Sequence, residues 1–302
     1  MNPERVKAIL KKVRDIEVRT KRLVNDSVAG QYHSVFKGRG MNFDEVREYV
    51  PGDEVRTIDW NVTARAGHPY VKKFTEEREL TILLVVDLSA SGNFGSASQS
   101  KREMAAELAS VLAFSAIRNS DKVGLVLFTD DVEQYIPPKK GRRHVLRVVR
   151  EILFFQPGKR GTDVPKALDF VNRVTAHRAI VFLVSDFQIA GDQAVAMAGL
   201  RHALRLTNRR HDLVALRIQD PREQSLPDVG MLAIEDAETG ELLELDTANP
   251  AVRERFAELS QTRTTKLRQA LNAEAVDSLE LSTGASYLPP LLRFFKNRKK
   301  RH

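Results

Sequence analysis

An aspartate and two serines follow the end of one apolar run, and their side chains carry the oxygen ligands that hard cations prefer. Residues 81–91 read Thr-Ile-Leu-Leu-Val-Val-Asp-Leu-Ser-Ala-Ser, so Asp87, Ser89 and Ser91 alternate along the chain. The run is short and rich in β-branched residues, which predicts a buried parallel strand. Open α/β sheets bind ligands beyond the carboxyl ends of such strands. One carboxylate and two hydroxyls at that place suit a divalent cation such as Mg2+.

Two later segments add oxygen side chains that complete this group. Gly161-Thr162-Asp163 precedes a predicted helix, and a second apolar run over residues 180–184 leads into Ser185-Asp186. If the two predicted strands are neighbours, one crevice is lined by Asp87, Ser89, Ser91, Thr162 and Asp186. The competing explanation is local, because Asp, Ser and Thr commonly cap helices and form turns. The combination of all three segments favours the metal site.

The set resembles the metal-ion-dependent adhesion site of von Willebrand factor A domains, whose five positions are all present here in the same order. The resemblance implies a bound Mg2+, or Mn2+ in its place, with one coordination position open to an Asp or Glu of a partner. It also implies a binding surface and not an enzyme. We expect Asp87, Ser89 and Ser91 to be the main ligands. Thr162 would bind directly or through water, and Asp186 through water.

The elements that must position these residues alternate between strands and helices from residue 80 onward. We predict strands at 80–86, 122–129, 179–185 and 211–218, and helices at 98–119, 141–154, 164–176 and 192–208. This alternation indicates a doubly wound, mostly parallel α/β sheet with helices on both faces. Further predicted elements are an edge strand near 132–136, a hairpin at 229–246, a helix at 249–273, a strand near 276–282 and a basic C-terminal helix.

The first part of the chain has a different character. We predict an N-terminal helix and connector over residues 1–37, with the helix at 3–25, then a small β-rich module at 38–79 and the main domain at 80–302. The module has a dense alternation of charge in Asp44, Arg47, Glu48, Asp53, Arg56, Asp59 and Arg65. We expect charge-paired hydrogen bonds from these residues to hold the module against the main domain. The alternative is a docking surface for a partner.

Three blocks of the module carry a family resemblance: Arg47-Glu48-Tyr49, Pro51-Gly52-Asp53 and Ile58-Asp59-Trp60. Together they resemble the signature of the domain of unknown function 58 family. The resemblance covers most of the chain and implies a von Willebrand A-like α/β fold. It also implies association with a MoxR-type AAA+ ATPase, or with a client of that ATPase. The protein would then be an adaptor in the assembly or maturation of protein complexes.

Composition excludes several other classes of protein. The 302 residues include no cysteine, so disulfides and thiolate metal sites are excluded. A membrane span needs about 18 apolar residues, and no apolar run approaches that length. No signal peptide is evident either, so we expect a cytoplasmic protein. Neither a Gly-x-Ser-x-Gly nor a P-loop motif occurs. A metal-dependent hydrolase or phosphatase remains an alternative, because a metal in such a crevice can activate water.

The net charge of +8 belongs to the two ends of the chain. Residues 1–24 carry eight basic and three acidic side chains, and residues 286–302 carry six basic and no acidic ones. We expect both ends to be solvated helix ends that aid solubility. The alternative is contact with nucleic acid through these termini. No aromatic pattern suited to base stacking accompanies either end.

Overall fold

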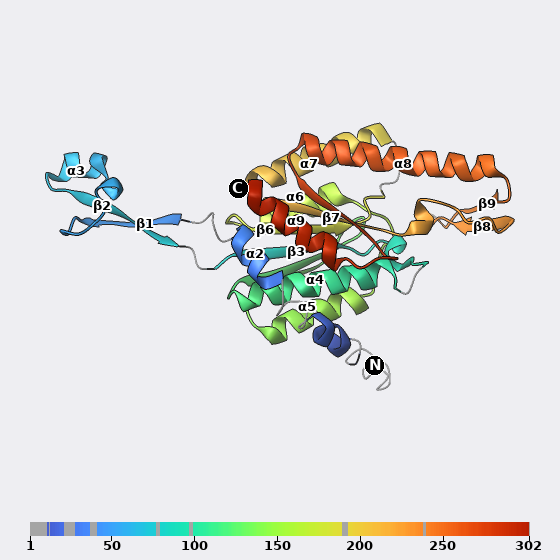
Figure 1. The fold of residues 1–302 in the computed structure, drawn as a ribbon, viewed down its shortest axis with the longest axis horizontal. Helices are drawn as coiled ribbons and strands as arrows, with labels where there is room; N and C mark the ends of the chain where they lie inside the picture. The colour runs from blue at the N-terminus through green and yellow to red at the C-terminus, as the bar shows by residue number, and fades with distance from the viewer. Residues whose placement is uncertain are drawn as a thin grey trace.

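A six-stranded sheet forms the centre of the molecule (Figure 1). The computed structural model describes residues 11, 13–20, 28–36, 41–76, 79–96, 99–188, 193–237 and 240–301. The strand order is β10-β7-β6-β3-β4-β5. The strands are β3 (Thr81–Asp87), β4 (Lys122–Phe128), β5 (Val132–Lys139), β6 (Ile180–Ser185), β7 (Asp212–Gln219) and β10 (Asp277–Ser282). All pair in parallel except β5, which is antiparallel to β4.

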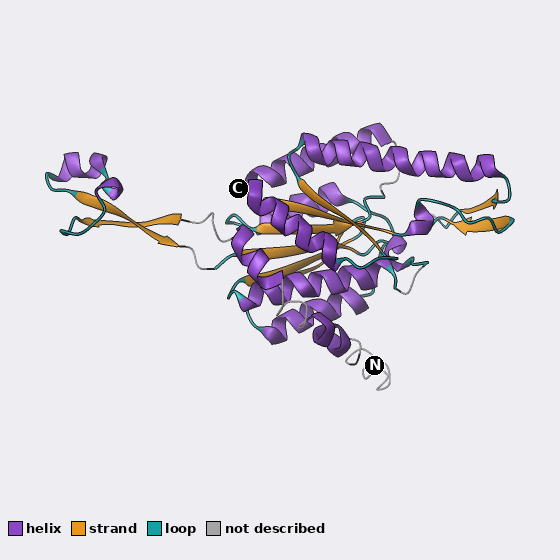
Figure 2. Cartoon of the chain, viewed as in Figure 1, coloured by secondary structure: helices purple, strands orange, loops and turns teal. Residues whose placement is uncertain are grey.

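Alternate side chains of the strands belong to two buried cores, one on each face of the sheet. On β3, Ile82, Leu84 and Val86 face the first core, whereas Leu83 and Val85 face the second. The first is covered by α2 (Ala29–Phe36), α4 (Lys101–Arg118), α5 (Arg142–Phe154) and α9 (Leu288–Arg301). The second is covered by α6 (Val164–Val174), α7 (Gln193–Arg210) and α8 (Pro250–Ala273). The predicted doubly wound α/β fold is therefore confirmed, and Figure 2 shows its layers.

The predicted strands and helices of the main domain are confirmed to within a few residues. The connector expected at 27–37 is wrong, because residues 29–36 form the helix α2. Val28, Tyr32, Val35 and Phe36 recur at helical spacing and are all buried. In the N-terminal segment, residues 11 and 13–20 are helical, and the remainder of the helix predicted at 3–25 lies outside the described residues.

The module at residues 41–76 is a β-hairpin with a helix in its connection. The strands β1 (Met41–Glu48) and β2 (Tyr70–Glu76) pair antiparallel, with a 3-10 turn at Val55–Thr57 and α3 (Trp60–Ala66) between them. The helix α3 was not predicted. Its signal is Asp59, whose carboxylate accepts hydrogen bonds from the backbone N–H groups of Asn61 and Val62.

This module extends away from the sheet, beyond the amino-terminal end of β3 (Figure 1). Arg47 forms a bidentate ion pair with Asp53, with N–O distances of 2.7 and 2.8 Å. Both residues belong to the module, so for this pair the prediction of a hydrogen bond between the module and the main domain is wrong. The pair instead fixes the turn at Pro51-Gly52, because Asp53 also accepts from the backbone N–H of Val50.

The basic C-terminal helix is confirmed as α9, but it is not simply a solvated end. Leu291 and Phe295 are fully buried, and Arg298 is 5% exposed. Arg298 forms ion pairs with Asp212 and Asp277 at the amino ends of β7 and β10. This helix is therefore a structural part of the domain, and only its outer face is solvated.

A second hairpin projects from the opposite end of the molecule, beyond the carboxyl ends of the parallel strands (Figures 1 and 2). It consists of β8 (Met231–Glu235) and β9 (Leu242–Asp246), as the sequence predicts. A 3-10 turn, η5 (Pro221–Glu223), precedes it after β7. Over the described ranges of the chain, no helix is both long and apolar enough to cross a membrane.

Candidate metal site

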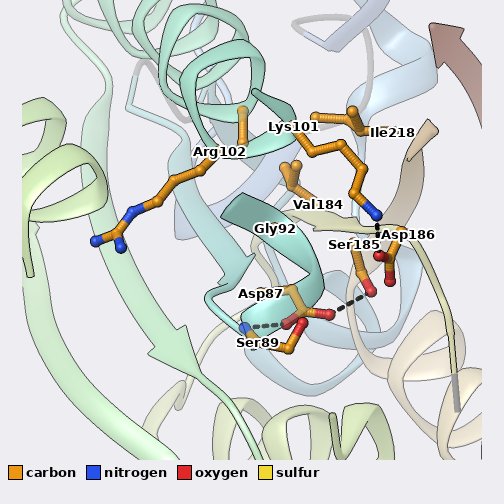
Figure 3. Close-up of a pocket in the computed structure, with 10 residues that line it drawn as sticks. Asp87, Ser89, Gly92, Lys101, Arg102, Val184, Ser185, Asp186 and Ile218 are labelled. Atoms are coloured by element: carbon orange, nitrogen blue, oxygen red, sulfur yellow. Dashed lines mark hydrogen bonds and ion pairs between the residues drawn. The ribbon is translucent and has the colours of Figure 1, made fainter. Parts of the chain in front are cut away.

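Two neighbouring parallel strands bring the predicted oxygen ligands together. β3 and β6 pair through Val86 and Val184, so Asp87 and Asp186 follow at the same edge of the sheet. The Ser91 hydroxyl donates to the Asp186 carboxylate at 2.8 Å and lies 3.0 Å from the Ser89 hydroxyl. The backbone N–H of Ser89 donates to Asp87 Oδ1 at 2.8 Å, which folds the Asp-x-Ser turn back over the strand end (Figure 3).

The fifth predicted residue reaches the group from the loop before α6. The Thr162 hydroxyl lies 3.5 Å from Asp87 Oδ2. At the preceding Gly161 this loop lies against Asp130, because a Cβ at that position would lie 1.9 Å from Oδ1 of Asp130. The backbone N–H of Asp163 also donates to the carbonyl of Thr129 at 2.9 Å. All five predicted residues therefore meet at one place.

Ser185 belongs to this group, although the sequence analysis did not select it. Its hydroxyl donates to Asp87 Oδ2 at 2.6 Å and accepts from the backbone N–H of Phe187 at 2.9 Å. Phe187 has the left-handed backbone angle φ +57°, which turns the chain sharply after β6. The sequence signal for Ser185 was its position next to Asp186 at the end of the strand. The Asp87 carboxylate is thus oriented by donors from the turn after β3, from β6 and from the loop before α6.

Lys101, the first residue of α4, supplies a positive charge inside the group. Its ammonium lies 2.5 Å from Asp186 Oδ2 and 2.5 Å from Glu223 Oε1. Its side chain is 3% exposed. Burial by itself lowers the pKa of Lys101, but the carboxylates of Asp186 and Glu223 outweigh burial and raise it above its ordinary value. Lys101 therefore stays charged and links the site to η5.

A cavity of about 20 Å³ lies beside these residues, between the sheet edge and α4. That volume is sufficient for about one water molecule. Lys101 and Asp186 line it and are in direct contact, whereas the guanidinium of Arg102 points away (Figure 3). Arg102 donates to the backbone carbonyls of Ile152 and Phe155 at the end of α5. Its role is to anchor α4, and Lys101 is the cation of the site.

The Asp87 carboxyl is perturbed by its surroundings. Burial raises the pKa of Asp87, and the nearby negative charge of Asp186 raises it further, to about 7. Hydrogen bonds from Ser185 and Ser89 oppose this rise. A cation bound at the site would offset both effects and favour the ionised carboxylate.

The chemistry of the donors fits a hard divalent cation. Mg2+ takes oxygen ligands, and this group offers two carboxylates and three hydroxyls from the predicted set. Within the residues that the structure describes, no three His, Cys, Asp or Glu side chains are grouped to hold a metal. The fit therefore depends on the hydroxyls of Ser89, Ser91 and Thr162. Lys101 is the one feature of the group that opposes a bound cation.

Fold and site together define an α/β domain with a carboxylate and hydroxyl site at the carboxyl edge of its sheet. The chain belongs to the family described as "Protein of unknown function DUF58", whose signature matches residues 45–266. It is 31% identical to the uncharacterised protein Rv1480 of Mycobacterium tuberculosis, over 95% of this chain and 89% of that protein. The predicted family membership is confirmed.

Solved structures that resemble the chain include the conserved hypothetical protein BatB from Bacteroides thetaiotaomicron. The identity is 16%, the TM-score is 0.46, and the match covers 73% of this chain and 99% of that one. Another is the vWF domain of the pilus tip protein Mfa5 from Porphyromonas gingivalis, at 13% identity and TM-score 0.39, over 74% of this chain and 95% of that domain.

Proposed function

We propose that the protein is a metal-dependent protein–protein interaction module. The observation that carries the proposal is the meeting of Asp87, Ser89, Ser91, Thr162 and Asp186 at one sheet edge. These residues would hold Mg2+ or Mn2+, and the metal would supply a positive centre for a carboxylate ligand. The chain's own residues contribute the rigid frame, because each side chain is fixed by hydrogen bonds to its neighbours.

Charge balance supports binding over catalysis. Two carboxylates offset the charge of a divalent cation, whereas the neutral hydroxyls leave it able to attract a third carboxylate. We propose that this carboxylate is an Asp or Glu of the partner. No histidine or tyrosine is among the residues that line the cavity, and its carboxylates Asp87 and Asp186 are assigned here to the metal.

The family resemblance suggests the class of partner. We propose a MoxR-type AAA+ ATPase, or a client of such an ATPase, with this protein as an adaptor in the assembly or maturation of protein complexes. The proposed compartment is the cytoplasm. Chelator-sensitive co-purification with the candidate ATPase tests this partner, and loss of the complex in an Asp87→Ala variant would tie it to the site.

The direct test of the site is calorimetric titration of Mg2+ and Mn2+ into chelator-treated protein. We expect one-site binding by the wild type and at least a hundredfold loss in Asp87→Ala, roughly 3 kcal/mol. Asp131→Ala is the matched control, because Asp131 is 45% exposed and pairs with Lys159 and Lys166 outside the group. Equal affinities for the wild type and Asp87→Ala would contradict the proposal, provided circular dichroism shows both folded.

Metal binding should also depend on pH. In the metal-free protein the pKa of Asp87 is raised from 3.8 to about 7, so below pH 7 the folded protein holds a proton that the metal must displace. Affinity is expected to fall about tenfold per unit as the pH drops from 7 towards 5, and to level off above 7. Titration in buffers of different ionisation enthalpy would measure the released proton directly. A flat profile between pH 5 and 8 would show that the metal displaces no proton with a pKa near 7.

A further inference from the structure

The β8–β9 hairpin has an apolar surface that the domain does not use. Cross-strand pairing places Leu232 opposite Leu245 and Ile234 opposite Leu243, so four apolar side chains share one face. Leu243 is 59% exposed, Leu232, Ile234 and Leu245 are half-buried, and on the other face Leu242 is 73% exposed. None of these five positions belongs to either buried core of the described chain. An isolated two-stranded hairpin has little stability by itself.

The hairpin is nevertheless held firmly at its base. The buried Thr247 donates its hydroxyl to the carbonyl of Gly230 at 2.7 Å and accepts from the backbone N–H of Val229 at 3.1 Å. Arg253, in the first turn of α8, pairs with Asp228 at 3.3 Å and donates to the Ala248 carbonyl at 3.0 Å. The apolar strands are therefore presented on a fixed support, on the same side of the molecule as the metal site (Figure 1).

The negative charge of the hairpin indicates the chemistry of its partner. Residues 229–246 contain six acidic side chains and no lysine or arginine. Such a surface repels the phosphates of nucleic acid and of anionic lipid. Within the strands, Glu235, Glu244 and Asp246 lie on the face opposite Leu243. A protein segment whose apolar side chains alternate with basic ones would therefore present one kind to each face and form apolar contacts and ion pairs together. Each of the two strands also has an outer edge, where an extended segment can add as a further strand.

We propose that the β8–β9 hairpin is a docking arm for a basic, apolar segment of a partner protein. Its contacts are separate from the residues of the metal site, so this inference does not depend on metal binding. The arm would give the partner a second point of attachment, and two linked contacts bind more tightly than either alone.

The test uses the full chain and a short fluorescein-labelled peptide of alternating leucine and lysine, followed by anisotropy in the presence of chelator. We expect binding about tenfold or more tighter than for the same peptide with glutamate in place of lysine. Leu243→Ser should reduce the binding by a similar factor. Val195→Ser on α7 is the matched control, because Val195 is 71% exposed and lies outside the hairpin.

A second variant protects the test against misfolding of the hairpin. Glu244→Gln removes one charge from an exposed position and keeps the shape of the side chain. It should weaken the binding of the lysine peptide and not the binding of the glutamate peptide. Equal binding of the two peptides, or no effect of either hairpin variant, would overturn the proposal. So would adsorption of the wild type, and not Leu243→Ser, to phosphatidylglycerol vesicles. A dimer by light scattering that Leu243→Ser dissociates would assign the surface to a second copy and overturn it as well.

Discussion

Replacing Lys101 by methionine is expected to raise the affinity for Mg2+ about tenfold or more, while destabilising the metal-free protein. The ammonium of Lys101 lies 2.5 Å from Asp186 Oδ2 and repels any cation that Asp186 attracts. At an effective dielectric constant of about 20, two unit charges 4 Å apart interact by roughly 4 kcal/mol, so even a strongly screened repulsion exceeds the 1.4 kcal/mol of a tenfold change. Removing that charge favours the metal.

The same substitution should lower the free energy of unfolding without metal by about 3–5 kcal/mol, because it leaves the carboxylates of Asp186 and Glu223 without their shared cation. Added Mg2+ would restore part of this loss, since ligand binding stabilises the folded state. Thermal unfolding with chelator and with Mg2+ measures both effects. Lys140→Met is the matched control, because Lys140 is 42% exposed and pairs with Glu79 at the opposite edge of the sheet.

Glu223→Gln should change the metal affinity in the other direction. Lys101 divides its charge between Asp186 and Glu223, so a neutral residue 223 leaves the whole ammonium charge facing Asp186. Mg2+ binding is then expected to weaken severalfold. Metal binding by Lys101→Met alone, and not by the wild type, would mean that the ammonium itself is the resident cation of this site. Unchanged affinity in both variants would show that Asp186 takes no part in metal binding.

The five oxygen side chains were predictable because each lies at or beside the end of a strongly patterned element. A buried strand that ends on Asp87 and another that leads to Asp186 fix two positions, and parallel pairing places both at one edge. Lys101 was not predictable in this way. Its burial results from where α4 begins and from the position of η5, whose Glu223 is far away in the sequence. Local pattern does not encode such a tertiary ion pair.

The missed helices have different physical causes. α2 is only eight residues long, and its apolar stripe of Tyr32, Val35 and Phe36 is too short to give a clear period. In the module, α3 contains the β-branched residues Val62 and Thr63, which obscure a helix that Asp59 nucleates by capping. Both helices are short: α2 is held by its buried side chains and α3 by its local cap, whereas in the main domain long periodic runs decided the structure.

Replacing Arg298 by methionine is expected to lower the free energy of unfolding by about 3–5 kcal/mol. The side chain is 4% exposed and joins Asp212 and Asp277, which begin neighbouring strands. Its guanidinium also lies 4.9 Å from the centre of the Phe36 ring of α2. Without Arg298, two partly buried carboxylates would lack their common cation, and α9 would lose its attachment to the amino edge of the sheet.

Urea denaturation of Arg298→Met and Lys296→Met measures this contribution, because Lys296 lies on the same helix but is exposed. Both variants lose one positive charge, so equal stabilities would refute a structural role for Arg298. The burial of α9 also limits how the basic terminus can be tested for nucleic-acid binding. Deleting residues 286–302 would remove the buried Leu291 and Phe295 from the core, and lost binding would then report unfolding. Charge reversal at the exposed Arg293, Lys296 and Lys299 keeps the core intact, so only that experiment isolates the charge of the helix.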